Sequence, residues 1–498
     1  MLFSSRFNSA ICSRASLPRL ACAFLCLSLL APEQSSAQTG TIGLNFTGVQ
    51  LSDGITLNGT SYAPPDNAGG VGPNNIVQLI NGAYAVYDKT TGTQQELISA
   101  RQFWSTAGFD PGSGISGLGA FNERILYDPT VDRWIAAGLT GDSTNNSVMI
   151  ARSDSANPLG SWKAVGFLGN VGGDGKFVDY TMMGVDANGV YVSTNNFTSI
   201  TGQYTDSSIF SLPKSDLLAP VPTIANLSRF DSVPFAMGAS IQPITDFGAA
   251  KDHAPLLATS FSGISTILDR TNILGTATAG ATLSATTPIT VAQYRNPPLA
   301  AQPDGTRVIS TIDDRLSANV YQVGHTLYAV HDTKVSGNSA ITWLKIDEQT
   351  NQVLQEGVLS NPSFDYFQPS VAANAKGDIV ISFTRSGFGA GGNLSDFAVV
   401  GQTLAGVTSF GTPFLLKASP VGNYHPINNR WGDYTTTVLD PNDPNIFWTF
   451  QEFASDSSSW ATQITQVIVP EPCSVLIAAM ALAALLATAW RRKWRAHT

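Results

Sequence analysis

The sequence predicts an all-β protein, and two observations carry the prediction. Between residues 38 and 469 no amphipathic helical period persists, and short apolar or alternating runs recur between Gly, Asn, Asp and Pro turns. Charged residues make up only 13% of the chain, while glycine is abundant, at 45 residues. Many short strands joined by tight turns account for both features.

The predicted strands come in a loose repeat of strand, turn, strand, loop and third strand. Such a unit predicts a three- or four-stranded meander, the pattern of one β-propeller blade. At roughly 50 to 60 residues per blade, the segment 61–468 predicts seven blades, with six or eight as alternatives. Residues 38–60 could supply a strand that closes the ring. Clear units cover residues 124–162, 179–213, 368–400 and 433–464.

The N-terminus predicts a signal peptide over residues 1–37. Three arginines lie within the first 19 residues, and residues 20–31 form an apolar run that is too short to span a bilayer comfortably. Small residues then precede a cleavage site between Ala37 and Gln38. A signal anchor that stays uncut is the alternative interpretation.

The C-terminus predicts a membrane-spanning tail. An apolar run over residues 474–490 would be about 25 Å long as a helix, near the minimum for a bilayer core. A basic cluster follows it, as expected for a membrane segment whose C-terminal end stays on the inner side of the membrane. A buried core helix is the alternative. The break before the run is Val469, Pro470, Glu471 and Pro472, and the membrane stop is Arg491, Arg492, Lys493 and Arg495.

This order of elements over residues 469–498 resembles the PEP-CTERM sorting signal of bacterial exported proteins. The resemblance implies that an exosortase of the inner membrane acts on the tail near the Pro-Glu-Pro motif. It implies a precursor that the tail holds in the inner membrane, and a product at the cell surface or in the extracellular space. That sorting system is associated with bacteria that produce exopolysaccharide. A plain anchor without sorting is the alternative.

Cysteine and charge restrict the function of the exported part. All four cysteines lie in the two terminal segments, so residues 38–468 can contain no disulfide, no thiolate nucleophile and no cysteine-based metal site. These residues include 20 Lys and Arg against 34 Asp and Glu, a formal charge of −14. Such a surface repels nucleic acid and anionic lipid, and is compatible with neutral glycans, divalent cations and a solvated matrix.

Most of residues 60–468 also resembles the sialidase-like β-propellers of secreted bacterial proteins. The segment 153–162 is similar to the Asp-box turn of sialidase blades, although its Asp and Gly are too far apart for a match. The landmarks of the resemblance are Pro64-Pro65-Asp66, Val71-Gly72-Pro73-Asn74-Asn75, Tyr127-Asp128-Pro129, Asp313-Asp314-Arg315 and Arg430-Trp431-Gly432-Asp433-Tyr434.

Carboxylates near predicted strand starts are the candidates for chemistry, because propeller loops converge on the axis there. A glycosidase needs two carboxylates that face one pocket. The same residues could instead cap turns or pair with Arg315 and Arg430, and we favour this structural interpretation. A sialidase would also need three arginines around a substrate carboxylate, and no spacing selects three. The candidates are Asp66, Asp179, Asp313, Asp314, Asp365 and Asp433.

Other candidate sites are weaker. The histidines of the exported part (His253, His325, His331 and His425) lack metal-ligand spacing, with His325 and His331 expected at opposite ends of a strand over 326–330. Turns at 172–175 and 440–445 could hold structural calcium, although turn formation alone explains both. Packing between blades is the default interpretation of the tryptophans, and Trp104 and Trp431 are the first choices if one of them forms a sugar-stacking platform. No catalytic, cofactor-binding or metal-binding residue is assigned.

Two functions are compatible with these sequence features. The first is a non-enzymatic binding or structural component of the cell envelope or of an exopolysaccharide matrix. The absence of a recognisable catalytic set and the sorting tail favour it. The second is a glycan-processing hydrolase or lyase with its site in the axial pocket of the propeller.

Overall fold

Strands dominate the computed structural model, which describes residues 40–60, 62–112, 119–141, 146–170, 174–260, 262–426 and 429–471. The prediction of an all-β protein is confirmed. The predicted signal peptide with its cleavage site at Ala37 and Gln38, the last residue of the sorting motif (Pro472), and the segments 474–490 and 491–495 lie outside the described residues.

Most strands belong to four-stranded antiparallel meanders that follow one another along the chain. Their central strands are buried and their last strands are more exposed, as expected when sheets pack face to face. The first three are β2 (Gly69–Val71), β3 (Asn75–Ile80), β4 (Ala83–Asp88) and β5 (Gln94–Ile98); β6 (Phe121–Asp128), β7 (Arg133–Gly141), β8 (Asn146–Ser153) and β9 (Trp162–Leu168); and β10 (Lys176–Val185), β11 (Gly189–Thr198), β12 (Tyr204–Pro213) and β13 (Ser228–Val233).

The next two meanders are joined edge to edge through a short parallel pairing of their first strands, in which Ile244 lies opposite Val320. A further strand, β18 (Thr287–Arg295), pairs with β16. The two meanders are β14 (Ala239–Asp246), β15 (His253–Thr259), β16 (Ile264–Leu274) and β17 (Thr282–Leu283); and β21 (Val320–Val323), β22 (Thr326–Val335), β23 (Asn338–Asp347) and β24 (Val353–Leu359).

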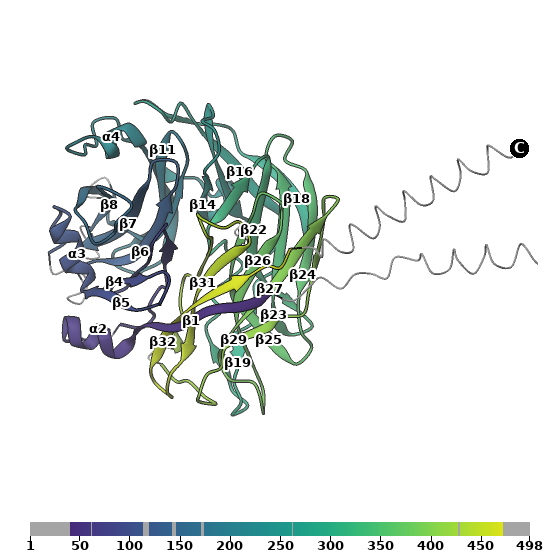
Figure 1. Cartoon of the computed structure of the whole chain (residues 1–498). Helices are drawn as coiled ribbons and strands as arrows, with labels where there is room; N and C mark the ends of the chain where they lie inside the picture. Colours follow the sequence, from purple (N-terminus) through teal and green to yellow (C-terminus); the bar gives the residue numbers. More distant parts are fainter. Residues whose placement is uncertain are drawn as a thin grey trace, which may run out of the picture. The chain divides into compact units, whose positions relative to one another are not determined.

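The last two meanders end the described chain. The final sheet takes its outer strand from the N-terminal end, because β1 pairs with β32 in antiparallel register (Figure 1). The strands are β25 (Phe364–Ala373), β26 (Ile379–Gly387), β27 (Ser395–Leu404), β28 (Val407–Phe410) and β29 (Phe414–Lys417), which pairs with β27; and β30 (Thr436–Leu439), β31 (Ile446–Ala454), β32 (Trp460–Ile468) and β1 (Thr41–Gln50).

The first strands of the sheets contact one another in succession. Strand β2 contacts β6, followed by β10, β14, β21, β25 and β30, and β30 contacts β2 again. This circular succession of antiparallel meanders is the β-propeller arrangement. We call the side on which these inner strands begin the start face and the side on which they end the end face.

Short additional elements lie in the connections between strands. They are a two-stranded sheet of β19 (Ala300–Ala301) and β20 (Arg307–Ile309), and the helices α2 (Leu51–Asn58), α3 (Ala100–Thr106), α4 (Lys214–Leu218) and η3 (Phe235–Met237). Helix α4 lies within a meander, between β12 and β13. Among the residues that the structure describes, no helix is long and apolar enough to cross a membrane. The predicted membrane helix over 474–490 is outside that set.

Candidate functional site

Four inner strands carry the same irregularity near the start face. The antiparallel register is interrupted near the beginning of β6 and β14 and midway along β10 and β25. One residue at each interruption, Asn122, Tyr180, Ser240 and Gln368, has a positive φ, between 50° and 59°. A bulge of this kind re-aims the neighbouring side chains and backbone groups, so polar groups of successive sheets can meet here.

Side chains of one sheet cap the bulges of the next. The Asn122 backbone N–H donates to Asn81 Oδ1 (2.9 Å) at the end of β3. The corresponding pairs are Ser240 N with Asn195 Oδ1 (3.1 Å) and Gln368 N with Asp332 Oδ2 (3.1 Å). We call these three contacts the inter-sheet clamps. Because they satisfy buried backbone donors, Asn81, Asn195 and Asp332 have a structural role.

Three of the predicted carboxylates gather on the start face. The Asp433 backbone N–H donates to Asp66 Oδ1 at 3.0 Å, which joins the segments before β30 and β2. The Arg430 guanidinium pairs with the Asp433 carboxylate. Asp179 accepts hydrogen bonds from the Tyr180 backbone N–H (2.8 Å) and from the Asn122 side chain. We call Asp66, Asp179, Arg430 and Asp433 the start-face cluster.

Two carboxyl groups of the start-face cluster, Asp66 and Asp179, have raised pKa values. Burial and the neighbouring Asp433 raise the pKa of Asp66, against the opposing effect of Arg430. Burial also raises the pKa of Asp179. Since Asp66 contacts the backbone of Asp433, covalent geometry keeps their carboxyl groups within about 8 Å of each other. That spacing is compatible with two-carboxylate chemistry.

Arginine and tyrosine side chains fill the centre below this cluster. The Arg315 guanidinium lies 4.4 Å from the Tyr180 ring centroid, and Arg124 lies 3.7 Å from that of Tyr434. The two tyrosine rings are 4.9 Å apart. The spacing of arginines along the chain could not show that Arg124, Arg315 and Arg430 all come near the centre.

These arginines do not form a free three-arginine grip. Arg315 donates to both carboxylate oxygens of Asp313, at 2.6 and 2.5 Å. Arg124 is buried and donates to the Thr181 backbone carbonyl at 3.0 Å. With Arg430 paired to Asp433, each guanidinium is held by groups of the protein itself.

A pocket of about 370 Å³ opens on the start face beside Arg315. Aromatic side chains (Phe197 and Tyr204) form part of its lining, and amide and hydroxyl groups of Asn195, Ser240 and Asn296 form another part. Predicted residues Asp313, Asp314 and Arg315 also line it. We call it the start-face pocket.

Asp314 is a carboxyl group of the start-face pocket with a strongly raised pKa. Burial, together with the charge of Asp313, raises its pKa to about 7. With the Asn296 amide oriented to donate, its nitrogen lies 3.1 Å and 3.2 Å from the two Asp314 oxygens. Asp313 behaves in the opposite way, because the attraction of Arg315 outweighs burial and lowers its pKa. The pocket therefore holds one carboxyl group that titrates near neutrality.

Aromatic rings continue from the start-face pocket along the neighbouring surface. Phe177 and Phe197 have ring centroids 5.7 Å apart, Phe197 and Tyr204 5.9 Å, and Tyr204 and Phe235 5.4 Å. Phe235 is 51% exposed. Apolar ring faces beside planar hydrogen-bonding groups suit ligands that are apolar on one side and polar at the edges. These aromatic residues were not among the candidates predicted from sequence, because Phe177, Phe197 and Tyr204 belong to separate strands of one sheet and Phe235 belongs to the helix η3.

Three of the candidates from sequence, two tryptophans and one carboxylate, have the structural role that was the favoured interpretation. Trp104 and Trp431 cannot serve as a sugar-stacking platform, because both are buried, and Trp431 Nε1 donates to Thr384 Oγ1 at 3.0 Å. Asp365 lies away from the cluster. It accepts the backbone N–H groups of Ala301 (2.9 Å) and Ser339 (2.7 Å) and pairs with Arg307 (2.9 Å), which is a structural role.

The histidines are dispersed. The predicted strand over 326–330 placed His331 at its end. In the structure β22 extends to Val335, so His331 lies inside the strand. Burial lowers its pKa to about 4. His253 contacts Glu348 (2.8 Å), and His425 contacts Asp304 (3.4 Å). Over the described residues, no group of three or more His, Cys, Asp or Glu side chains has a metal-binding arrangement.

The two turns considered for calcium use their carboxylates within the protein. Asp440 pairs with Lys89 (2.7 Å) and accepts from Trp448 Nε1 (2.9 Å). Asp443 accepts the Asn445 backbone N–H at 2.8 Å. In the other turn, of which 172 and 173 lie outside the described residues, Asp174 accepts the Lys176 backbone N–H at 3.0 Å. These contacts are those of ordinary turns.

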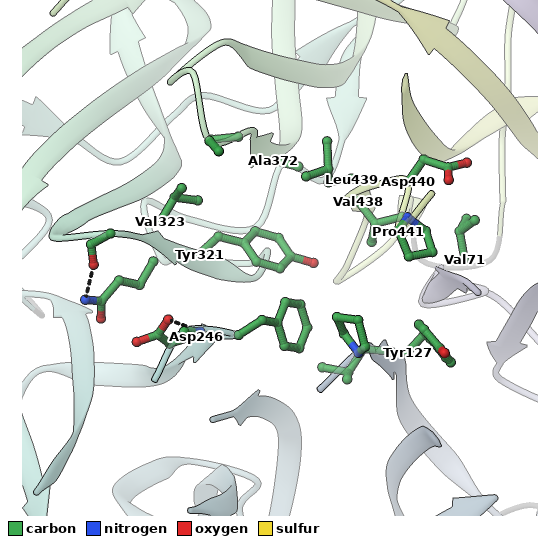
Figure 2. Close-up of a pocket in the computed structure, with 18 residues that line it drawn as sticks. Val71, Tyr127, Asp246, Tyr321, Val323, Ala372, Val438, Leu439, Asp440 and Pro441 are labelled. Atoms are coloured by element: carbon green, nitrogen blue, oxygen red, sulfur yellow. Dashed lines mark hydrogen bonds between the residues drawn. The ribbon is translucent and has the colours of Figure 1, made fainter. Parts of the chain in front are cut away.

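A second pocket, of about 340 Å³, lies on the end face (Figure 2). Its lining is mostly apolar and comes from the ends of the inner strands and the turns that follow them. Tyr321 lies across it, with Val323 and Ala372 on one side and Val438 on another in the view of Figure 2. We call it the end-face pocket. No pattern in the sequence predicted it.

The first residues of the predicted sorting motif rest on the domain. Val469 is buried, and its backbone N–H donates to the Asn445 carbonyl at 2.8 Å. The Pro470 carbonyl accepts from Gln402 Nε2 at 2.9 Å, and Glu471 pairs with Lys376 at 3.2 Å. The described chain therefore ends on the end face.

Comparisons with known proteins do not assign a family. No protein-family model matches the sequence, and no curated protein matches it. Similar solved structures include Drosophila Semaphorin 1a, extracellular domains 1–2, at 8% identity, with 86% of this chain and 88% of that chain covered and a TM-score of 0.41. The polysaccharide lyase Uly1 aligns at 8% identity over 68% of this chain and 88% of its own, with a TM-score of 0.36. An endo-arabinase from Bacteroides thetaiotaomicron aligns at 10% identity over 70% and 94%, with a TM-score of 0.32. Likeness at this level identifies no ligand and no reaction.

Proposed function

We propose that this protein is an exported seven-bladed β-propeller that binds a glycan of the cell envelope or exopolysaccharide matrix without transforming it. The binding site is the start-face pocket. Residues 38–60 close the ring by contributing the outer strand of the last blade.

One observation carries the proposal of glycan binding: aromatic rings and edge-binding polar groups meet in a single pocket. Phe197 and Tyr204 offer apolar faces to the apolar face of a sugar ring. Asn296 and Asp314 offer amide and carboxyl groups for its hydroxyls. The protonated form of Asp314 can both donate and accept, which suits an uncharged hydroxyl-rich ligand.

Retention on the native polysaccharide tests this function. The secreted protein should bind to polysaccharide from its own organism immobilised on beads, and Tyr204→Ala should release most of it. Phe388→Ala is the matched control, because Phe388 is another exposed aromatic (51%) outside the lining of the pocket. Absence of retention on every native glycan and cell-surface fraction would contradict the proposal.

We propose further that the terminal segments direct export. The signal peptide 1–37 is removed between Ala37 and Gln38, and the helix 474–490 holds the precursor in the inner membrane, stopped by Arg491, Arg492, Lys493 and Arg495. An exosortase then acts near Pro470-Glu471-Pro472. Replacement of that tripeptide by alanines should leave full-length protein in the membrane fraction. Trimming and release at the normal rate would show that the tail is a plain anchor.

A glycan-processing enzyme is the second candidate, and the start-face cluster is the observation that favours it. Asp66, whose pKa is raised, could act as an acid beside the carboxylate of Asp433. Incubation of the native polysaccharide with the protein would then produce new reducing ends or unsaturated uronates. Asp66→Asn and Asp433→Asn should each abolish them, whereas the proposal of binding alone predicts no product with any variant.

A further inference from the structure

The end-face pocket is built by most of the propeller rather than by one loop. The inner strands β2, β6, β14, β21, β25 and β30 all contribute their last residues or the turns that follow. Leu126 and Ala372 are buried parts of the lining, whereas Pro129, Gly248 and Gly324 are exposed at its rim. The pocket is therefore open to solvent and framed by rigid strands.

The carboxylates at this pocket are already paired. Asp246 receives Lys251 Nζ at 2.6 Å and the Gly248 backbone N–H at 2.8 Å. Asp440 receives Lys89 Nζ at 2.7 Å and Trp448 Nε1 at 2.9 Å. Burial raises the pKa of the Tyr321 phenol, which keeps this group uncharged at neutral pH. A charged ligand would find no free counter-charge among the lining residues.

The remaining lining is hydrophobic and large enough for a ligand. It includes Val71, Phe247, Val323, Val438 and Leu439. The volume of about 340 Å³ is roughly twice that of a 150 Å³ apolar cavity able to bind benzene. Concave apolar surface of this size, left open in a monomer, is the usual character of a ligand pocket.

We propose that the end-face pocket is a binding site for a compact, uncharged hydrophobic ligand of about two fused rings in size. The site is separate from the proposed glycan site, because Arg124, Tyr180 and Tyr434 fill the centre between the two faces. The two sites can therefore be tested independently.

Photolabelling of the full-length chain tests the proposal. The probes are the uncharged 3-trifluoromethyl-3-phenyldiazirine and its para-carboxylate, which share one ring system and differ in charge. Labelled residues are mapped by mass spectrometry after digestion, so label taken up elsewhere is distinguished by position. We expect the uncharged probe to label the segments around Phe247 and Tyr321 at least fivefold more than the carboxylate does.

Two variants distinguish binding in the end-face pocket from nonspecific labelling of apolar surface. Val323→Trp places a large ring at the pocket and should lower labelling of those segments at least fivefold. Val358→Trp, the same change at a residue that is 45% exposed on the outer strand β24, should leave it unchanged. Circular dichroism spectra of both variants should match that of the wild-type protein.

Any one of several results would overturn the proposal. They are labelling of the pocket segments no greater than that of other described segments, equal labelling by the two probes, or no effect of Val323→Trp in a folded variant. Labelling that occurs only after removal of residues 472–498 would also contradict it, because the chain's own C-terminal segment would then be the occupant.

Discussion

At the scale of residues, many polar groups of the start face hold neighbouring sheets together. Asn81, Asn195 and Asp332 each accept a backbone N–H from a bulge in the following sheet. An acceptor of this kind matters because a buried N–H without a partner costs far more than an exposed one. Asp314 and Tyr204 line the start-face pocket, in which we propose that the ligand binds.

The clamp of Asn195 can be tested by truncation. Asn195→Ala removes the acceptor of the buried Ser240 N–H, and we expect it to lower the free energy of unfolding by about 1–3 kcal/mol. Asn157→Ala is the matched control: Asn157 also accepts a backbone N–H, from Leu159 (3.1 Å), but it does so on the surface. Its cost should be about 0.5 kcal/mol or less. Equal costs in urea unfolding would show that Asn195 is no clamp.

Asp314 predicts a pH dependence of stability. Its pKa is about 7 in the folded protein, above the ordinary value of 3.8. A group with a raised pKa favours folding fully below its ordinary pKa, and this contribution is lost as the pH rises through about 7. The wild-type protein should therefore lose about 1–3 kcal/mol more stability than Asp314→Asn between pH 5 and pH 8. Urea unfolding at both pH values measures the difference, and parallel pH profiles would disprove the raised pKa.

The residue scale also shows what the sequence could predict of the site. Carboxylates near predicted strand starts, such as Asp66, Asp179 and Asp433, were expected to converge, and they do, because inner strands begin on one face. Asp365 fits the same pattern but caps the backbone of Ala301 and Ser339. Position along a strand predicts the face on which a residue lies, but it does not identify the groups that contact it.

At the scale of elements, the pairing of β1 with β32 joins the two ends of the described chain. Cα partners run from Thr41 opposite Ile468 to Gln50 opposite Ala461. Thr465 Oγ1 donates to Asn45 Oδ1 at 2.9 Å, so these two opposed side chains face each other. This pairing fixes the first sheet beside the last one.

A disulfide can test that closure. The double variant Asn45→Cys with Thr465→Cys should oxidise readily, because opposed residues of antiparallel strands have suitable Cα separations. A crosslink between segments so far apart in the chain should raise the free energy of unfolding by about 2–4 kcal/mol. The reduced form of the same variant is the control. Failure to form the bond in the folded protein would contradict the pairing.

Alternation of apolar residues and turn residues predicted the strands well. They did not predict where a strand ends or where it carries a bulge. The predicted strand over 326–330 lies within the longer β22, because the polar residues His331 to Lys334 continue the ladder opposite β23. The bulges of β6, β10, β14 and β25 carry four unlike residues, Asn, Tyr, Ser and Gln, so no shared residue type marks them in the sequence.

At the scale of the whole molecule, the two faces differ in chemistry. The start face combines carboxylates, arginines, amides and aromatic rings, whereas the end face has a mostly apolar pocket whose charges are paired. Repeated meanders were sufficient to predict a propeller. Neither pocket could be predicted, because residues such as Asn195, Tyr204, Asn296 and Asp314 meet only through the packing of separate sheets.

The binding of a native oligosaccharide at the start-face pocket is the central claim, and titration calorimetry tests it most directly. Oligosaccharides released from the organism's own polysaccharide should bind the wild-type protein and Phe388→Ala equally. Phe197→Ala and Tyr204→Ala should each weaken binding about tenfold, as expected for the loss of about 1.4 kcal/mol of ring contact. Undiminished binding by both pocket variants, with their folds intact, would contradict the account.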